Sequence, residues 1–193
     1  MKNVIVVILL NLFFASSLFA QAIKFKTLPK TTDEFVKLRN KTAKTPEGGA
    51  AMFMLALKIY NDNNELGEKF LVLSVDINQL RSGDVYKGYK VGSSDMSLIK
   101  RQLNNNNKIP NAYIEGANLK NNYSVNLPYI YKFSHNKYSG DKSQGKFKVF
   151  VKCYGADSPR PIHLRKNSKG IWKAVSWSSV LVGIKKPAII DDL

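Results

Sequence analysis

The sequence predicts an α+β domain, with N-terminal helices packed on a C-terminal antiparallel β-meander sheet. Up to about residue 103, apolar residues recur mostly at helical spacing. From about residue 111, short apolar segments follow, each bounded by glycine, proline or asparagine, as a meander requires. Helices followed by strands are typical of α+β domains, in which the helices cover one face of the sheet.

Four helices are expected in the N-terminal half, over residues 31–42, 46–60, 66–80 and 94–103. Thr31 and Glu34 have the spacing of a capping box at the start of the first helix. The second helix is apolar nearly all round, which predicts a buried helix at the centre of the core. Gly48 and Gly49 disfavour a helical first turn, so we expect another backbone to approach closely there.

Five short strands are expected in the C-terminal half, over residues 112–115, 129–133, 147–154, 162–165 and 171–177. Residues 82–84 and 87–89 are expected to be loops, and residues 167–170 a hairpin turn. Trp172 and Trp177 have opposite parity in the last strand. We therefore expect one of them in the core and the other exposed, as a candidate for stacking on a ligand.

Residues 1–20 have the pattern of a secretory signal peptide. Lys2 provides a positive start, and Val4–Phe14 form an apolar run interrupted by one asparagine. The run is short for a membrane span and lacks a basic flank, which favours a cleaved leader over an uncleaved anchor. Cleavage is expected after Ala20 or after Ala22, where small residues precede the bond.

The remaining chain is expected to be one exported protein, periplasmic or secreted. Residues 28–187 are predicted to form a single α+β domain, followed by a short acidic tail over residues 188–193. Cys153 is the sole cysteine, so no intramolecular disulfide can form and the fold must rest on packing.

The chain is strongly basic, with 30 lysines and arginines against 14 aspartates and glutamates and a net charge of +16. The surplus is densest in residues 132–173, where only Asp141 and Asp157 oppose it. Such a surplus implies attraction to anionic partners. For an exported protein we expect an anionic envelope surface, an acidic glycan or an acidic protein; nucleic acid is disfavoured. The alternative is a lysine-rich composition that serves solubility alone.

Strand parity concentrates this charge on one predicted surface. The core side of strand 147–154 is expected to carry Phe147, Val149, Val151 and Cys153. The opposite side carries basic and aromatic residues, namely Lys148, Phe150, Lys152 and Tyr154. In the next strand, parity places His163 and Arg165 outside. If the two strands pair as a hairpin, all six residues share one surface.

The turn between these strands adds a seventh candidate binding residue. Pro159 and Pro161 flank Arg160 and hold it in an extended conformation. A guanidinium positioned in this way can clamp a carboxylate or phosphate. The alternative is a local ion pair between Arg160 and Asp157.

Catalytic and metal chemistry have little support in the sequence. Cys153 and His163 lie on adjacent predicted strands, but parity sends them to opposite faces, which argues against a dyad. Ser158, His163 and Asp157 have the residue types of a triad without any recognisable motif. Two histidines and one cysteine disfavour a zinc site, and we expect no cofactor or metal.

Three blocks of sequence resemble a known family. Thr45–Phe53 reads TPEGGAAMF, Gly155–Ile162 reads GADSPRPI, and Gly170–Lys173 reads GIWK. These blocks resemble a family of bacterial exported domains of unknown function, over about Leu28–Pro187. The resemblance implies one bacterial exported domain and assigns no catalytic residue.

The first hypothesis is a non-enzymatic domain that binds an anionic envelope component or an acidic partner through the basic-aromatic sheet face. The alternative is a small-molecule binder or weak hydrolase with a pocket between helices and sheet. A structural protein without a ligand is a third hypothesis, in which the charge reflects composition.

Overall fold

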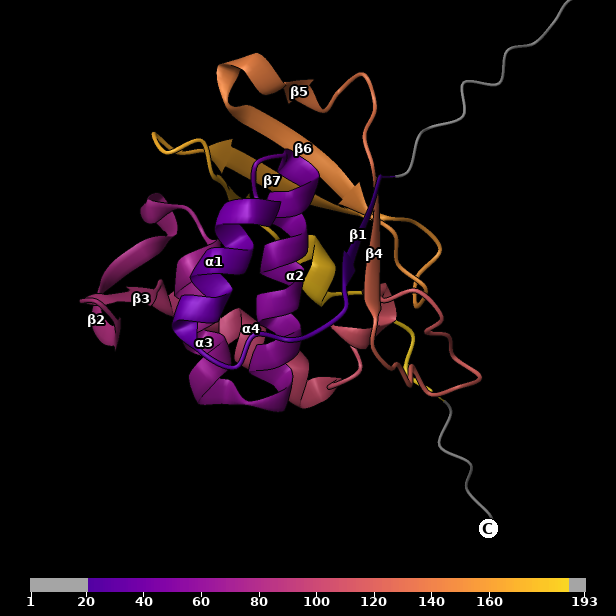
Figure 1. The fold of residues 1–193 in the computed structure, drawn as a ribbon. Helices are drawn as coiled ribbons and strands as arrows, with labels where there is room; N and C mark the ends of the chain where they lie inside the picture. Colours follow the sequence, from indigo (N-terminus) through magenta and orange to yellow (C-terminus); the bar gives the residue numbers. More distant parts are fainter. Residues whose placement is uncertain (1–20, 188–193) are drawn as a thin grey trace, which may run out of the picture.

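A computed structural model describes residues 21–187. The predicted signal peptide and the acidic tail lie outside these residues. Within them, four α-helices and an antiparallel sheet of six strands confirm the α+β class. Figure 1 shows α1 and α2 in front of a strongly bent sheet, with β1 and β4 along one side and β6 and β7 crossing above α2.

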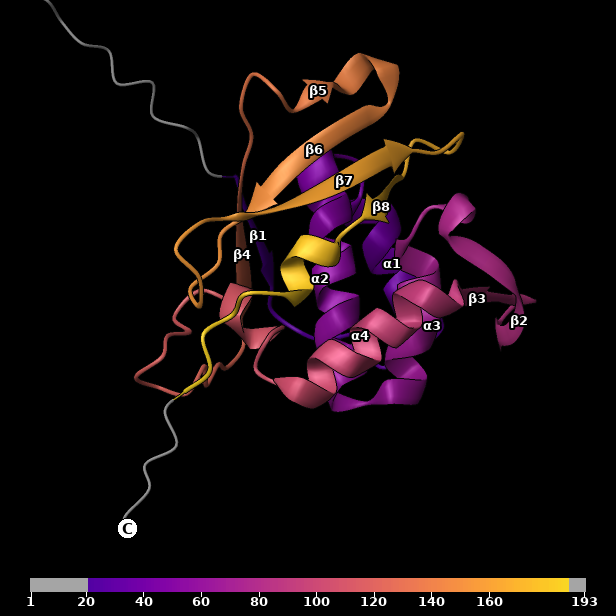
Figure 2. The same cartoon turned by 180° about the vertical axis from the view of Figure 1, so that it is seen from behind.

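The four helices are α1 (Thr32–Thr42), α2 (Pro46–Asp62), α3 (Asn64–Ser74) and α4 (Ser93–Asn105). Every residue of α2 from Pro46 to Tyr60 is buried, as the apolar run predicts. Helix α4 comes to the front when the molecule is turned, on the other side from α1 (Figure 2). In the part of the chain that the structure describes, no helix combines the length and apolarity that a bilayer crossing requires.

Both glycines at the start of α2 meet another backbone, which confirms the predicted close approach. A Cβ on Gly48 would lie 1.8 Å from the carbonyl oxygen of Thr42. A Cβ on Gly49 would lie 2.7 Å from both the Cβ and the carbonyl oxygen of Trp172. The hydroxyl of Thr45 caps the helix by accepting from the Gly48 amide at 3.1 Å.

The main sheet runs in the order β1 (Gln21–Phe25), β4 (Tyr129–Ser134), β6 (Lys146–Val151), β7 (Arg160–Lys166), β8 (Trp172–Ser176). A short strand, β5 (Gly140–Asp141), pairs with β6 beside this path. Strands β4, β6, β7 and β8 correspond to the predicted strands 129–133, 147–154, 162–165 and 171–177. Strand β1 was not expected, because it is short and directly follows the leader-like sequence.

The predicted strand over residues 112–115 is wrong. Asn111–Tyr113 form a 3₁₀ turn instead. Ala112, Tyr113 and Ile114 are all buried, without the alternation of a strand, and the Tyr113 hydroxyl donates to the Val180 carbonyl at 2.9 Å. The Glu115 amide still donates to the Ile130 carbonyl, so the chain reaches β4 without forming a strand.

Residues 75–91 also differ from the prediction. Helix α3 ends at Ser74 because Val75 forms a parallel bridge with Ala174 and thereby joins the edge of β8. The expected loops are instead a hairpin of β2 (Leu80–Tyr86) and β3 (Tyr89–Val91). Both residues of its turn, Lys87 and Gly88, have positive φ, the backbone geometry that two-residue hairpins favour.

The expectation of one exposed tryptophan is wrong, since Trp172 and Trp177 are both 3 % exposed. Strand alternation does not extend to Trp177, because β8 ends at Ser176 and a 3₁₀ turn (Ser178–Leu181) follows. The Trp177 ring packs on Phe53 of α2, with ring centroids 5.0 Å apart. Neither indole is therefore available to stack on a ligand.

Candidate functional site

The outward side of β6 and β7 carries most of the residues that the sequence singles out. Phe147, Val149 and Val151 are buried, whereas Lys148 and Phe150 are half-buried and Lys152 is exposed. In β7, Ile162 and Leu164 are buried beside the exposed His163 and half-buried Arg165. We define the basic sheet face by six residues: Lys148, Phe150, Lys152, Tyr154, His163 and Arg165.

Cross-strand pairing brings these side chains together in the predicted way. Lys148 lies opposite His163, and Lys146 lies opposite Arg165. Between them is a hollow of about 260 Å³, lined in part by these four residues and by Tyr138. An anionic group entering this hollow would meet four basic side chains from two adjacent strands.

Two lysines, Lys148 in β6 and Lys152 just after it, lie against neighbouring aromatic rings. The Nζ of Lys148 is 5.3 Å from the centroid of the Phe150 ring, and the Nζ of Lys152 is 5.0 Å from that of Tyr154. Neither lysine forms a salt bridge with any acidic residue between positions 21 and 187. Their charges are therefore held in place by apolar rings and left uncompensated by acids.

The positive charge of Lys148 also affects the pKa of His163. Burial, and then the positive charge of Lys148, lower the pKa of His163 below its ordinary value. The imidazole is therefore neutral at pH 7. An anion bound beside Lys148 would oppose both effects and raise this pKa.

Arg165 and Arg160 contribute less to this face than the sequence suggests. The Arg165 guanidinium pairs with Asp76 at 3.4 Å, so an acid already opposes its charge. Arg160 has the parity of the core-side residues of β7. It donates to the Ser158 hydroxyl and to the Gly183 carbonyl, both at 3.3 Å. Arg160 therefore secures the turn to the C-terminal segment and does not share the basic sheet face.

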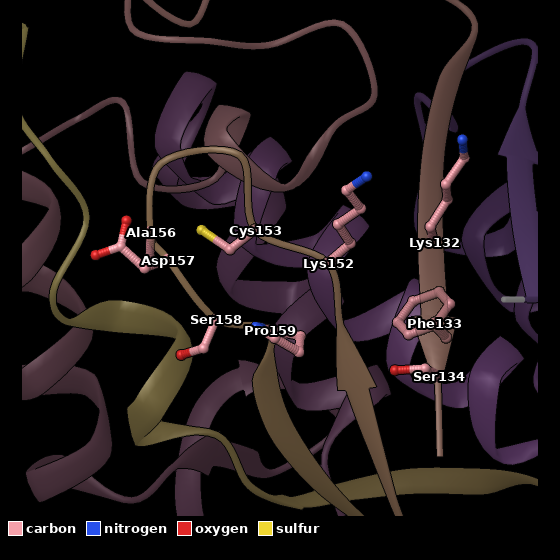
Figure 3. Close-up of a pocket in the computed structure, with 9 residues that line it drawn as sticks. All are labelled: Lys132, Phe133, Ser134, Lys152, Cys153, Ala156, Asp157, Ser158 and Pro159. Atoms are coloured by element: carbon pink, nitrogen blue, oxygen red, sulfur yellow. The ribbon is translucent and has the colours of Figure 1, made fainter. Parts of the chain in front are cut away.

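The turn after β6 forms a second hollow of about 290 Å³, whose lining is drawn in Figure 3. The Asp157 carboxylate accepts from Lys185 at 2.7 Å, in place of the expected local pair with Arg160. The amines of Lys132 and Lys152 extend to the same side of the hollow (Figure 3), and Lys132 is paired with Glu115. Little free charge other than that of Lys152 therefore faces this hollow.

Cys153 lacks the properties of a nucleophile. It is 8 % exposed on the core side, whereas His163 is exposed on the outward side. Burial raises the pKa of the Cys153 thiol, so it stays protonated at neutral pH. Over residues 21–187, no three His, Cys, Asp or Glu side chains gather in a way that could hold a metal ion.

A buried carboxylate joins α2 to the segment around β5. Glu47, 2 % exposed in the first turn of α2, accepts from Lys142 at 3.1 Å and lies 3.8 Å from the Nδ1 of His135. Its second oxygen, Oε2, is buried without a hydrogen-bond donor. The positive end of the α2 dipole favours this charge, so the carboxylate has a structural role.

We expect Glu47→Gln to lower the free energy of unfolding by about 1–2 kcal/mol, because the ion pair is lost while the exposed Lys142 becomes hydrated. Urea titration at pH 7 measures the change. Glu65→Gln is the matched control, since its pair with Lys69 joins largely exposed side chains on α3. Equal effects of the two substitutions would contradict the role assigned to Glu47.

A third region, a groove beside the edge of β8, was not predicted from the sequence. It lies between α1, the end of α3, the β2–β3 hairpin and the β7–β8 turn, with a volume of about 680 Å³. Its basic residues are Arg39, Lys44, Lys87, Lys169 and Lys173. They are scattered along the chain, and the hairpin that closes the groove was expected to be loop, so no local pattern could reveal it.

Comparison with known proteins gives a family but no function. A family model described as a domain of unknown function (DUF6935) matches residues 27–188. No curated protein and no solved structure matches the chain. Because the model covers most of the sequence, including α1–α4 and strands β2 to β8, the chain belongs to the DUF6935 family of domains of unknown function.

Proposed function

We propose that this protein is an exported, non-enzymatic binding domain that attaches to an anionic component of the cell envelope through the basic sheet face. The observation that carries the proposal is the pair of uncompensated lysines, Lys148 and Lys152, each laid against an aromatic ring. Soluble domains tend to intersperse charges of both signs on their surfaces. A row of cations without acids on a rigid strand favours an anionic surface as partner.

The geometry of the face supports an extended partner. Lys148 projects from β6 next to Lys146, and alternate residues of a strand are about 6.5–7 Å apart. Lys152 directly follows the end of this strand. A membrane headgroup layer or an acidic glycan presents anionic groups repeatedly along a surface and can contact several of these lysines together. The aromatic rings restrict the lysine side chains, so less conformational entropy is lost on binding.

Export is part of the proposal and is supported by the sequence of residues 1–20. Cleavage after Ala20 would leave all of β1 in the mature chain, whereas cleavage after Ala22 would remove Gln21 and Ala22 from it. Residues 21–193 are therefore the chain to use in binding experiments. The protein would act in the periplasm or outside the cell.

The test is co-sedimentation of residues 21–193 with phosphatidylglycerol-containing vesicles, with neutral phosphatidylcholine vesicles and with purified cell wall, over a salt series. We expect binding to the anionic vesicles or the cell wall, falling as salt rises because exposed charges are screened over about 10 Å at 0.1 M salt. Lys148→Ala/Lys152→Ala should bind roughly thirtyfold more weakly, at about 1 kcal/mol for each lysine near an anionic surface.

The matched control is Lys37→Ala/Lys41→Ala, which removes the same charge from exposed positions on α1. A general effect of net charge would weaken both double variants equally and would contradict the proposal. Binding unaffected by salt, or no sedimentation with either anionic material at low salt, would do the same. Binding to an acidic protein but to neither envelope material would also contradict the proposal and would identify a protein as the partner.

The alternative of a pocket between helices and sheet has weaker support. That space is occupied by α2, whose residues from Pro46 to Tyr60 are all buried. Gly49 lies so close to Trp172 and Leu164 that no room for a ligand is left at that end of the helix. Small-molecule binding is therefore better sought at the groove beside β8.

A further inference from the structure

The groove beside β8, here called the cationic groove, has the size of a small-molecule site. Its volume of about 680 Å³ lies within the range of typical ligand pockets, roughly 300–1,000 Å³. Its lining contains the five basic residues named above and no acidic residue. Apolar side chains also line it: Val36, Val72, Leu80 and Ile171. The groove therefore combines charged residues of positive sign alone with apolar walls.

Two of its cations converge on one neutral acceptor. The Nη1 of Arg39 donates to the Leu73 carbonyl at 3.3 Å, and the Nζ of Lys173 donates to the same oxygen. Leu73 lies in the last turn of α3, where carbonyls lack helical partners and the dipole is negative. A carbonyl supplies only a partial negative charge, so a guanidinium and an amine meet there without a carboxylate in contact.

The nearest acid is engaged elsewhere. Asp76 is 4 % exposed, and its Oδ1 pairs with Arg165 at 3.4 Å and accepts from the Asn78 amide at 3.1 Å. The Asp76 carboxylate attracts the Lys173 amine electrostatically, although the two do not form a salt bridge. Burial, followed by the charge of Arg39, lowers the pKa of Lys173 to about 7, and Asp76 opposes this shift only in part. Positive charge is therefore in excess at the inner end of the groove.

The hairpin adds aromatic surface to the lining of the groove. Tyr86 and Tyr89 both line the groove, and the Nζ of Lys87 lies 5.5 Å from the centroid of the Tyr86 ring. Tyr89 and Ile77 also line the groove and are 44 % and 59 % exposed. A flat ring resting between these residues would cover surface that the fold leaves open.

We propose that the cationic groove binds a small molecule with an oxyanion at one end and a ring at the other. The phosphate or carboxylate would accept from Arg39 and Lys173, and the ring would lie against Tyr86 and Tyr89. Phosphate and carboxylate share the chemistry that a guanidinium and an ammonium recognise together. The groove and the basic sheet face have no residue in common, so this inference does not depend on the proposed function.

The test is calorimetric titration of residues 21–193 with inorganic phosphate, phenyl phosphate and benzoate at pH 7. We expect at least one aryl anion to bind, and phenyl phosphate to bind more tightly than inorganic phosphate because only the former has a ring. Lys173→Met and Lys87→Met should each weaken aryl-anion binding, the first by roughly tenfold or more because its amine is partly desolvated. The relative affinities of phenyl phosphate and benzoate then identify the preferred anion.

Two controls separate this site from the rest of the protein. Lys37→Met removes a charge from an exposed position of α1 outside the groove and should leave binding unchanged. Lys148→Ala/Lys152→Ala should also bind the aryl anions like the parent, because the sheet face is elsewhere. No binding of either aryl anion up to about 10 mM, weaker than ordinary fragment affinities, would overturn the proposal. Equal weakening by Lys37→Met and Lys173→Met would overturn it as well.

A second readout depends on the protonation of Lys173. An oxyanion beside the amine favours its charged form, so binding at pH 8 should draw a proton from the buffer. Titrations in buffers of different ionisation enthalpy measure this uptake. We expect it in the parent and in Lys87→Met, which retains Lys173, and not in Lys173→Met. Uptake that persists in Lys173→Met would contradict the assignment of the anion to this amine.

Discussion

Gly49→Ala is expected to lower the free energy of unfolding by about 3 kcal/mol or more, because overpacking a buried helix–sheet contact cannot be relieved by a side-chain movement. The added Cβ would lie 2.7 Å from the Trp172 Cβ and carbonyl oxygen and 2.9 Å from the Leu164 Cδ2. The β8 backbone at Trp172 cannot move away from the helix easily. The Trp172 amide donates to the Ala43 carbonyl at 2.8 Å and ties β8 to the α1–α2 turn.

Urea titration followed by far-UV circular dichroism at pH 7 measures this loss. Gly92→Ala is the control, because its Cβ would meet the Gln79 carbonyl oxygen at 3.4 Å and the Asp95 Oδ2 at 3.9 Å, both ordinary contacts. That variant should stay within about 0.5 kcal/mol of the parent. If Gly49→Ala were equally mild, α2 and β8 would have to separate more readily than the packing implies.

Lys173→Met is expected to raise the free energy of unfolding at pH 7, by about 3 kcal/mol, and to lose this advantage as the pH rises towards 10. The pKa of Lys173 is lowered to about 7 in the folded protein, mainly through burial, from an ordinary value of 10.5. Between these two values the unfolded chain binds more protons than the folded one. The parent therefore gains stability as the pH rises through this window, by up to about 1.4 kcal/mol for each pH unit.

Urea titrations of the parent and Lys173→Met at pH 7, 8.5 and 9.5 measure the convergence. The range stops below pH 10 because burial also raises the pKa values of several tyrosines, including Tyr60 and Tyr129, and their ionisation would destabilise the fold. Lys37→Met is the control and should differ from the parent by an amount that does not vary with pH. A constant difference for Lys173→Met would show that its amine is not held at a lowered pKa.

The two expected effects of Lys173→Met have opposite signs for stability and for binding. Removing the amine should stabilise the domain and should weaken the capture of an oxyanion. Buried charges that cost stability are common where a protein binds a ligand, because the ligand supplies the missing counter-charge. If both effects are measured, the cationic groove has the energetics of a binding site that is unfilled in the free protein.

The parts of the fold that could be predicted depend on local patterns. Alternation along β6 correctly separates Phe147, Val149 and Val151 from Lys148 and Lys152, because a strand has a period of two wherever it pairs. The close approach at Gly48 and Gly49 could also be inferred, since two glycines in a helical first turn need a reason. In both cases the residue types themselves carry the structural information.

The parts that could not be predicted depend on contacts distant in sequence. Helix α3 ends at Ser74 because Val75 forms a β-bridge with Ala174, and no sequence pattern near residue 75 predicts that bridge. The groove likewise requires Arg39 and Lys173 to meet at Leu73. Arg160 was a candidate anion clamp because its flanking prolines hold it extended, but its parity is that of the core-side residues and its guanidinium donates to the Gly183 carbonyl.

The pairing of β1 with β4 has a consequence for the order in which the chain can fold during synthesis. The register joins Gln21 to Phe133 and Phe25 to Tyr129, so the first described strand lacks its partner until four helices have been made. Contacts of such long sequence separation form slowly, because a large loop must be closed first. A nascent chain therefore keeps β1 unpaired until β4 has been made, so the sheet can be completed only late in synthesis.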